Sequence, residues 1–77
     1  MGFVFDYEVI DHIATLSDNK GITKEINILS FGGRAPVLDI RKWNRNSEDK
    51  QMLKGISLSK NEVRELINHV EDIKGYF

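Results

Sequence analysis

The sequence predicts an α+β domain in which four antiparallel strands are followed by one C-terminal helix. Two segments, 22–31 and 37–43, alternate between apolar and polar residues, which is the pattern of a strand with two different faces. From 59 to 74, apolar residues recur instead at the spacing of a helix. The 77 residues form one domain, 1–77, and a domain this short is only marginally stable by itself.

Two further strands are expected on either side of this pair. Residues 7–16 are rich in Val, Ile, Tyr and Thr, which favour strands, but the alternation is imperfect because Val9 and Ile10 are adjacent. The turn-forming cluster 17–21 then predicts a hairpin with the second strand. After a polar loop, 51–58 is expected to form the fourth strand.

The helix is expected over 59–74. Ser59 and Glu62 have the spacing of a capping box, in which each side chain accepts a hydrogen bond from the backbone amide of the other residue. Gly75 stands just past the expected end. The apolar stripe of this helix consists of Val63, Leu66, Ile67, Val70 and Ile73. We expect this stripe to cover one face of the sheet.

Alternation divides the expected sheet into two faces. The face under the helix would carry Ile22, Ile26, Ile28, Leu38, Ile40, Ile56 and Leu58. The opposite face would carry Asn27 and Phe31 from one strand, with Arg41 and Trp43 from the next. Aromatic rings beside basic groups, away from the core, are typical of surfaces on which single-stranded nucleic acid stacks. The alternative is that both rings belong to the core or to a dimer contact.

The charge of the chain is polarised. Residues 20–54 contain eight basic and four acidic side chains, whereas the remainder contains three basic and eight acidic ones. A basic middle indicates one surface that faces an anion. The absence of cysteine excludes a disulfide framework, and no apolar run reaches the length that spans a membrane. We therefore expect a soluble cytoplasmic protein, associated with the nucleoid if it is bacterial.

No enzyme is predicted. His12 and His69 are far apart and lack partners at the spacing of metal ligands. Asp11 precedes His12, but no nucleophile motif accompanies this pair. We expect neither a metal nor a cofactor.

Three features together resemble a known family. The segments 37–43 and 54–58, followed by the capped helix, resemble the single-stranded DNA-binding domain of the positive cofactor four family of transcriptional coactivators. The resemblance covers 22–73 and is strongest to the short bacterial YdbC-type members. It implies a curved sheet, a homodimer, and binding of single strands with little sequence preference.

The resemblance and the charge pattern together define the expected contacts. The residues expected to bind nucleic acid are Lys24, Asn27, Phe31, Arg34, Arg41, Trp43, Arg45 and Lys54. Within this set the resemblance implies stacking on Phe31 and Trp43. Arg41 could instead pair with Asp39, two positions earlier on the same face. Lys54 falls on the isoleucine face by alternation, so a bulge at Gly55 is needed to turn it toward the aromatic rings.

The expected partners are single-stranded DNA and a second copy of the chain. RNA remains an alternative, because stacking and phosphate contacts serve both nucleic acids. Transcription or repair proteins are further candidate partners. A function of a different class also stays open, namely a small protein-interaction module that uses the same aromatic face.

Overall fold

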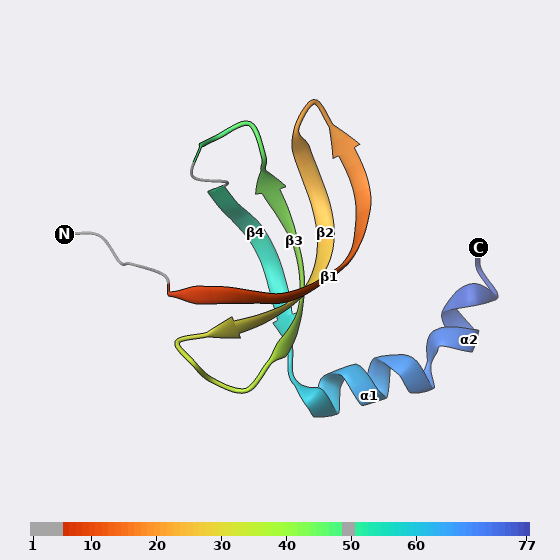
Figure 1. Ribbon diagram of the computed structural model, residues 1–77. Coiled ribbons are helices and arrows are strands. Elements are labelled where there is room, and N and C mark those ends of the chain that lie inside the picture. The colour runs from red at the N-terminus through yellow and green to blue at the C-terminus, as the bar shows by residue number, and fades with distance from the viewer. Residues whose placement is uncertain (1–5, 49–50) are drawn as a thin grey trace.

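The computed structural model describes residues 6–48 and 51–77 (Figure 1). The elements are β1 (Tyr7–Asn19), β2 (Ile22–Phe31), β3 (Val37–Asn44), β4 (Gln51–Leu58), α1 (Lys60–Asn68) and α2 (Val70–Lys74). The four strands form one sheet in the order β1-β2-β3-β4, and every neighbouring pair is antiparallel. The predicted α+β fold, four antiparallel strands and then helix, is confirmed.

The predicted hairpin between the first two strands is present, with a tighter turn than expected. β1 continues to Asn19, and the turn consists of Lys20 and Gly21, whose φ angles are 53° and 87°. Two positive φ angles in a two-residue turn match the right-handed twist of the flanking strands. The Asp18 carboxylate accepts a hydrogen bond from the Gly21 amide at 3.0 Å, which steadies the turn.

Three bulges bend β1 against β2. The ladder shifts by one residue between Val9 and Asp11, and it shifts twice more before the turn. The extra residues are Ile10, Ile13 and Leu16, each about half exposed. A bulge bends its strand and increases the local twist. The imperfect alternation of this segment therefore has a structural cause, and the β1 residues that face the interior recur at every third position.

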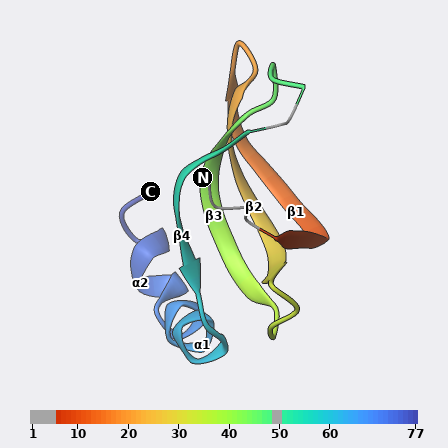
Figure 2. The ribbon, with the colours of Figure 1, turned by 90° about the vertical axis from the view of Figure 1, so that its left-hand side faces the viewer.

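The sheet curls so strongly that the beginning of β1 reaches the end of β3. Tyr7 pairs with Phe31 and Trp43 pairs with Thr23, and these two partners are eight residues apart on β2. Eight residues of flat strand would span about 26 Å. The rings of Tyr7 and Trp43 nevertheless lie in contact. In Figure 1, β1 crosses in front of the other strands, and Figure 2 shows the sheet curving from β4 round to β1.

The buried residues lie inside this curl. We call this side the inner face; it carries Thr23, Glu25, Asn27 and Leu29 of β2 with Asp39, Arg41 and Trp43 of β3. All of them except Arg41 are at most 6% exposed. The expected core side, here called the outer face, carries the isoleucines, and Ile56 is 59% exposed. The prediction that the isoleucine face forms the core is therefore wrong for the single chain, because the curl buries the other face.

The helical part begins as predicted but does not cover the sheet. The capping box is present: the Ser59 amide donates to Glu62 Oε1 at 2.8 Å, and the Glu62 amide donates to Ser59 Oγ at 3.4 Å. The expected single helix is divided at His69 into α1 and α2. Both extend away from the end of β4 with no buried residue, so the prediction that they cover the isoleucines is wrong (Figure 1). Neither helix is long and apolar enough to cross a membrane, and this holds for all the residues that the structure describes.

Candidate nucleic-acid interface

Glu25 is the centre of a buried ionic network on the inner face. Its side chain is 4% exposed and accepts hydrogen bonds from Arg45 Nη2 at 2.5 Å and Arg45 Nε at 2.9 Å. The Thr23 hydroxyl donates to it at 2.5 Å and the Asn27 amide at 3.3 Å. The Arg45 hydrogen bond, helped by those of Thr23 and Asn27, lowers the pKa of Glu25 to about 2, against the opposing effect of burial. Arg45 is a predicted nucleic-acid contact, but its positive charge is thus paired with Glu25 of the same chain.

Asn27 links this network to β1. Its side-chain oxygen accepts a hydrogen bond from His12 Nδ1 at 2.6 Å, and the Thr15 hydroxyl donates to His12 Nε2 at 3.2 Å. The sequence predicts Asn27 as a nucleic-acid contact, yet its side chain is 1% exposed and both ends of its amide are already bonded. Half of the His12 side chain remains exposed, so of the bonded pair Asn27 and His12 it is His12 that is accessible to solvent.

A second ionic pair lies beside the first. Arg41 Nε and Nη2 donate to the two carboxylate oxygens of Asp39 at 2.5 and 2.6 Å, and Arg41 Nη1 donates to the Leu53 carbonyl at 3.2 Å. Asp39 also accepts from the Ser57 hydroxyl at 2.7 Å. The alternative that Arg41 pairs with Asp39 is confirmed. Because this pair is bidentate and almost fully buried, Arg41 is not free to neutralise a phosphate.

Gly55 allows β4 to approach this pair closely. Gly55 is the cross-strand partner of Arg41. A Cβ atom at Gly55 would lie 1.9 Å from Arg41 Cβ and 2.6 Å from Arg41 Cα, distances at which no side chain fits. The glycine is therefore required by close packing of two strands.

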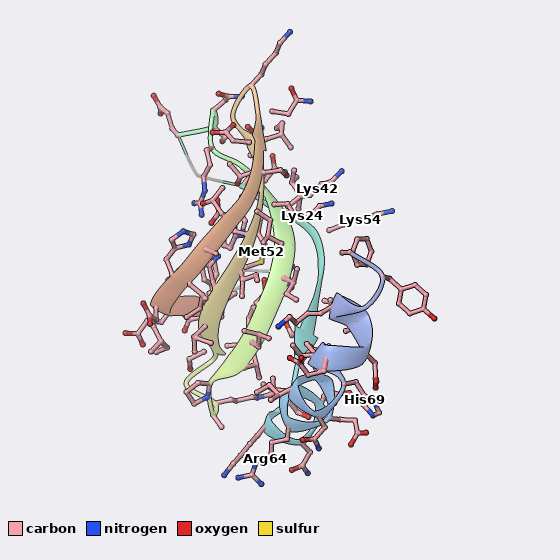
Figure 3. All side chains as sticks on the ribbon, turned by 90° about the vertical axis from the view of Figure 1, so that its right-hand side faces the viewer. Lys24, Lys42, Met52, Lys54, Arg64 and His69 are labelled. Carbon is pink, nitrogen blue, oxygen red and sulfur yellow. The ribbon has the colours of Figure 1, made fainter. Side chains whose placement is uncertain are left out.

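The predicted bulge in β4 exists, but it does not turn Lys54 inward. The ladder between β3 and β4 shifts by one residue between Arg41 and Trp43, opposite Leu53 and Lys54. Leu53 lines a hollow of the inner face together with Met52. Figure 3 shows Lys54 on the other side of the sheet from Met52. Lys54 therefore lies on the isoleucine face, where alternation places it, because the bulge turns its neighbour Leu53 to the inner face instead.

Lys54 belongs to a row of three lysines on the outer face, which we call the lysine row. Lys24 and Lys42 are cross-strand partners, and Figure 3 shows that Lys24, Lys42 and Lys54 point to the same side. All three are exposed, and within 6–48 and 51–77 none of them has an ion-pair partner. Lys24, like Lys54, thus lies on the isoleucine face and not beside the aromatic rings. The row concentrates positive charge that no other described residue neutralises.

Arg34 stands at the opposite end of β2 and β3. Gly32 and Gly33 have φ angles of 58° and 74° and form a tight turn. The Arg34 amide donates to the Phe31 carbonyl at 3.0 Å, and the Ser30 hydroxyl donates to the Arg34 carbonyl at 2.7 Å. Arg34 is held at its backbone while its side chain is exposed.

Three aromatic rings gather on the inner face. The Tyr7 ring lies 6.4 Å from that of Phe31 at 49° and 5.9 Å from that of Trp43 at 57°. The guanidinium of Arg45 lies 4.5 Å from the centre of the Trp43 ring system. Such distances and tilts are typical of favourable ring and cation–π contacts. The sequence predicts the pair Phe31 and Trp43, and the structure adds Tyr7 between them.

Trp43 is buried, contrary to the expectation that it presents its ring to a partner. It is 1% exposed, and its indole Nε1 has no hydrogen-bond acceptor among the described residues. A buried donor without an acceptor destabilises the folded state by about 1–3 kcal/mol. Phe31, in contrast, is half-buried. In this conformation Phe31 is accessible to a base, whereas Trp43 is covered.

Two hollows open on the inner face. The histidine hollow, of about 430 Å³, is lined by Tyr7, Val9, His12, Thr15, Trp43 and Arg45, with Glu25 and Asn27. The phenylalanine hollow, of about 490 Å³, is lined by Tyr7, Phe31, Arg41, Met52 and Leu53. Tyr7 lines both, so the two hollows adjoin. Within the described residues, no cluster of His, Cys, Asp and Glu could hold a metal ion.

Sequence reasoning missed Tyr7 and His12, although a signal for His12 exists. Residues 7–16 were difficult to assign to a face because strict alternation fails there, whereas positions 9, 12 and 15 pair with the inward residues of β2. A three-residue repeat in a β-branched segment therefore indicates repeated bulges.

The geometry combines an apolar and aromatic interior with charges that compensate each other. Among the described residues, positive charge without an ion-pair partner lies on the lysine row, at the turns and, as Lys60 and Arg64, on α1. A family model described as transcriptional coactivator p15 (PC4) matches residues 19–69. A search among curated proteins returned no significant match.

Proposed function

The chain belongs to the transcriptional coactivator p15 (PC4) family, and we propose that it binds single-stranded DNA, with little sequence preference, in the two hollows of its inner face. The observation that carries this proposal is the adjoining pair of hollows with three aromatic rings. Stacking on a ring contributes about 1–3 kcal/mol per base and tolerates any base. The proposed mechanism is binding alone, which would protect or present open DNA in transcription, replication or repair.

Bases would enter at the phenylalanine hollow. Phe31 is half-buried and lines this hollow beside Met52 and Leu53, so a base can reach its ring without rearrangement. Trp43 would become a second stacking surface only after a neighbouring side chain moves, because its ring is covered.

Phosphates would be bound by the lysine row and by Arg34. Freeing Arg41 or Arg45 would leave a buried carboxylate without its partner, which is strongly destabilising. β4 is an edge strand, and Lys54 directly follows Leu53, which lines the phenylalanine hollow. A DNA strand with its bases in this hollow would therefore pass over the edge of β4 onto Lys54. Neutralising phosphates releases counterions, so the affinity should fall as salt rises.

A homodimer is the second part of the proposal. The outer face and the helices expose apolar side chains, including Ile56 at 59% and Ile67 at 63%. Apolar surface of this extent on a small domain is typical of an interface. A second copy is the occupant that we propose, because each copy offers both a sheet face and an apolar helix stripe, and a two-fold arrangement covers both together. The lysine row lies nearer the Lys20–Gly21 turn than Ile26, Ile40 and Ile56 do, and it would stay outside this contact.

The proposal is tested by comparing nucleic acids in one assay. Fluorescence anisotropy with labelled oligo-dT, with duplex of equal length and with oligo-U should show strong preference for oligo-dT over the duplex and a steep loss of affinity with salt. Equal binding to single strands and duplex, or no binding at low salt, contradicts the proposal. Tighter binding of oligo-U would make RNA the ligand. Sedimentation velocity tests the dimer, and a monomer at micromolar concentration would refute it.

A further inference from the structure

We propose that Tyr7 is a nucleobase-stacking residue, which leaves its contact with Trp43 and joins Phe31 and Trp43 in one stacking surface when a single strand binds. This inference rests on the proposed function. It concerns a part of the chain outside residues 19–69, which the family model matches. Tyr7 lies on β1, whereas Phe31 and Trp43 lie on β2 and β3.

The position of Tyr7 is the first argument. Tyr7 stands between the two other rings, with centroid distances of 6.4 and 5.9 Å. It is also the aromatic residue that lines both the histidine hollow and the phenylalanine hollow. Any strand that occupies both hollows must therefore pass the ring of Tyr7.

The burial of Trp43 is the second argument. At 1% exposure, its ring can meet a base only if a neighbour moves. Arg45 is held to Glu25 by hydrogen bonds from two of its nitrogens, so its place over the indole is secured. Tyr7 is the first residue of an edge strand, hydrogen-bonded to a neighbouring strand on one side only. Tyr7 and Arg45 both contact the Trp43 ring, and of these two side chains Tyr7 is the one with freedom to move.

The free donor of Trp43 is the third argument. Its Nε1 is buried without an acceptor among the described residues, an arrangement that destabilises the closed state. A base carbonyl or a phosphate oxygen in the histidine hollow would provide this acceptor once Tyr7 has moved. Opening is thus favoured by the ligand and not by the free protein.

The experiment uses the single tryptophan as its reporter. Trp43 is the only tryptophan of the chain, so its emission reports directly on this site. Oligo-dT is titrated into the full-length chain and into Tyr7→Ala, Tyr7→Phe and Tyr7→Leu, with Ile13→Ala as the matched control. Ile13 also lies on β1, but it is half exposed and lines neither the histidine hollow nor the phenylalanine hollow.

Loss of the ring should weaken binding by about 5- to 100-fold, the effect of one stacked base. Tyr7→Phe and Ile13→Ala should bind within about twofold of the parent. The dependence of affinity on salt should be the same in all variants, because no phosphate contact is removed. In the free Tyr7→Ala protein, the Trp43 emission should shift to the red.

Two results would overturn the proposal. Unchanged or tighter binding by Tyr7→Ala would show that Tyr7 is a cover and not a contact. Tyr7→Leu keeps apolar bulk over Trp43, so it provides the test if the alanine variant does not fold. If Tyr7→Leu binds oligo-dT like the parent, stacking on Tyr7 is refuted. If the parent itself does not bind oligo-dT, the proposed function fails. This outcome can be distinguished from the two results above, in which the parent binds and only the role of Tyr7 is refuted.

Discussion

The ring of Tyr7 lies 5.9 Å from the ring of Trp43, although the two residues stand at opposite ends of the strand ladder. A contact between the start of the first strand and the end of the third is possible only in a strongly curled sheet. The same curl buries Trp43 and creates the hollows of the inner face. Stability and the candidate site therefore depend on the same residues.

Trp43→Ala should destabilise the domain by about 3–5 kcal/mol, the effect of removing a large buried ring. Trp43→Phe should destabilise it less, because a ring remains and the unpaired Nε1 is removed. Equilibrium urea unfolding measures both free energies. If Trp43→Ala costs less than about 1 kcal/mol, Trp43 is not part of the core.

Acid should weaken the fold through Glu25. Its pKa is about 2 in the folded protein and 4.5 for an ordinary glutamate, so its stabilising contribution is complete above pH 4.5 and is lost as pH falls toward 2. Between pH 6 and pH 3 the free energy of unfolding should drop by about 2 kcal/mol from this group. Urea unfolding of Glu25→Gln over the same range provides the control, since this variant should lack that part of the pH dependence. Parallel curves for the two proteins would contradict the assignment.

Gly55→Ala should destabilise the domain by about 1–3 kcal/mol, because the added methyl group meets the Arg41 backbone. Gly75→Ala is the matched control. A Cβ at Gly75 has its nearest neighbour at 3.4 Å, and the Gly75 φ of −61° suits any residue. Thermal unfolding should therefore separate the two variants, and equal midpoints would argue against the close approach of β3 and β4.

Lys54→Gln should reduce the salt dependence of single-strand binding. Each phosphate contact contributes about 0.7 to the slope of log affinity against log salt for single strands, so the slope should fall by about that amount. Lys74→Gln is the control, because Lys74 lies on α2 and already pairs with Glu71 at 3.3 Å. An unchanged slope for Lys54→Gln would remove the lysine row from the proposed path.

Local sequence patterns were sufficient to predict the strands and the helix, but they could not predict which face of the sheet is buried. Alternation correctly grouped Asn27, Arg41 and Trp43 on one face, and the capping box correctly started the helix. The curl of the sheet decides which face is buried, and the bulges of β1 promote this curl. The curl also brings Tyr7 into contact with Trp43, which lies 36 positions later in the sequence. No local pattern encodes that contact.

The same limit applies to the charges. The Asp39–Arg41 pair could be predicted, because the two residues are two positions apart on one face of a strand. The Glu25–Arg45 pair could not, because its members come from the hairpin side of β2 and from the loop after β3. Two of the predicted phosphate contacts are consequently engaged inside the protein.

The bulges of β1 have a consequence for the behaviour of the protein at high concentration. β1 is an edge strand, and it exposes Val9, Ile10, Ile13 and Leu16. A long, regular and apolar edge would be a template for pairing with other chains and hence for aggregation. The one-residue shifts interrupt the even spacing of its free amide and carbonyl groups three times along its length. The irregularity that shapes the inner face thus also protects the outer edge from uncontrolled sheet extension.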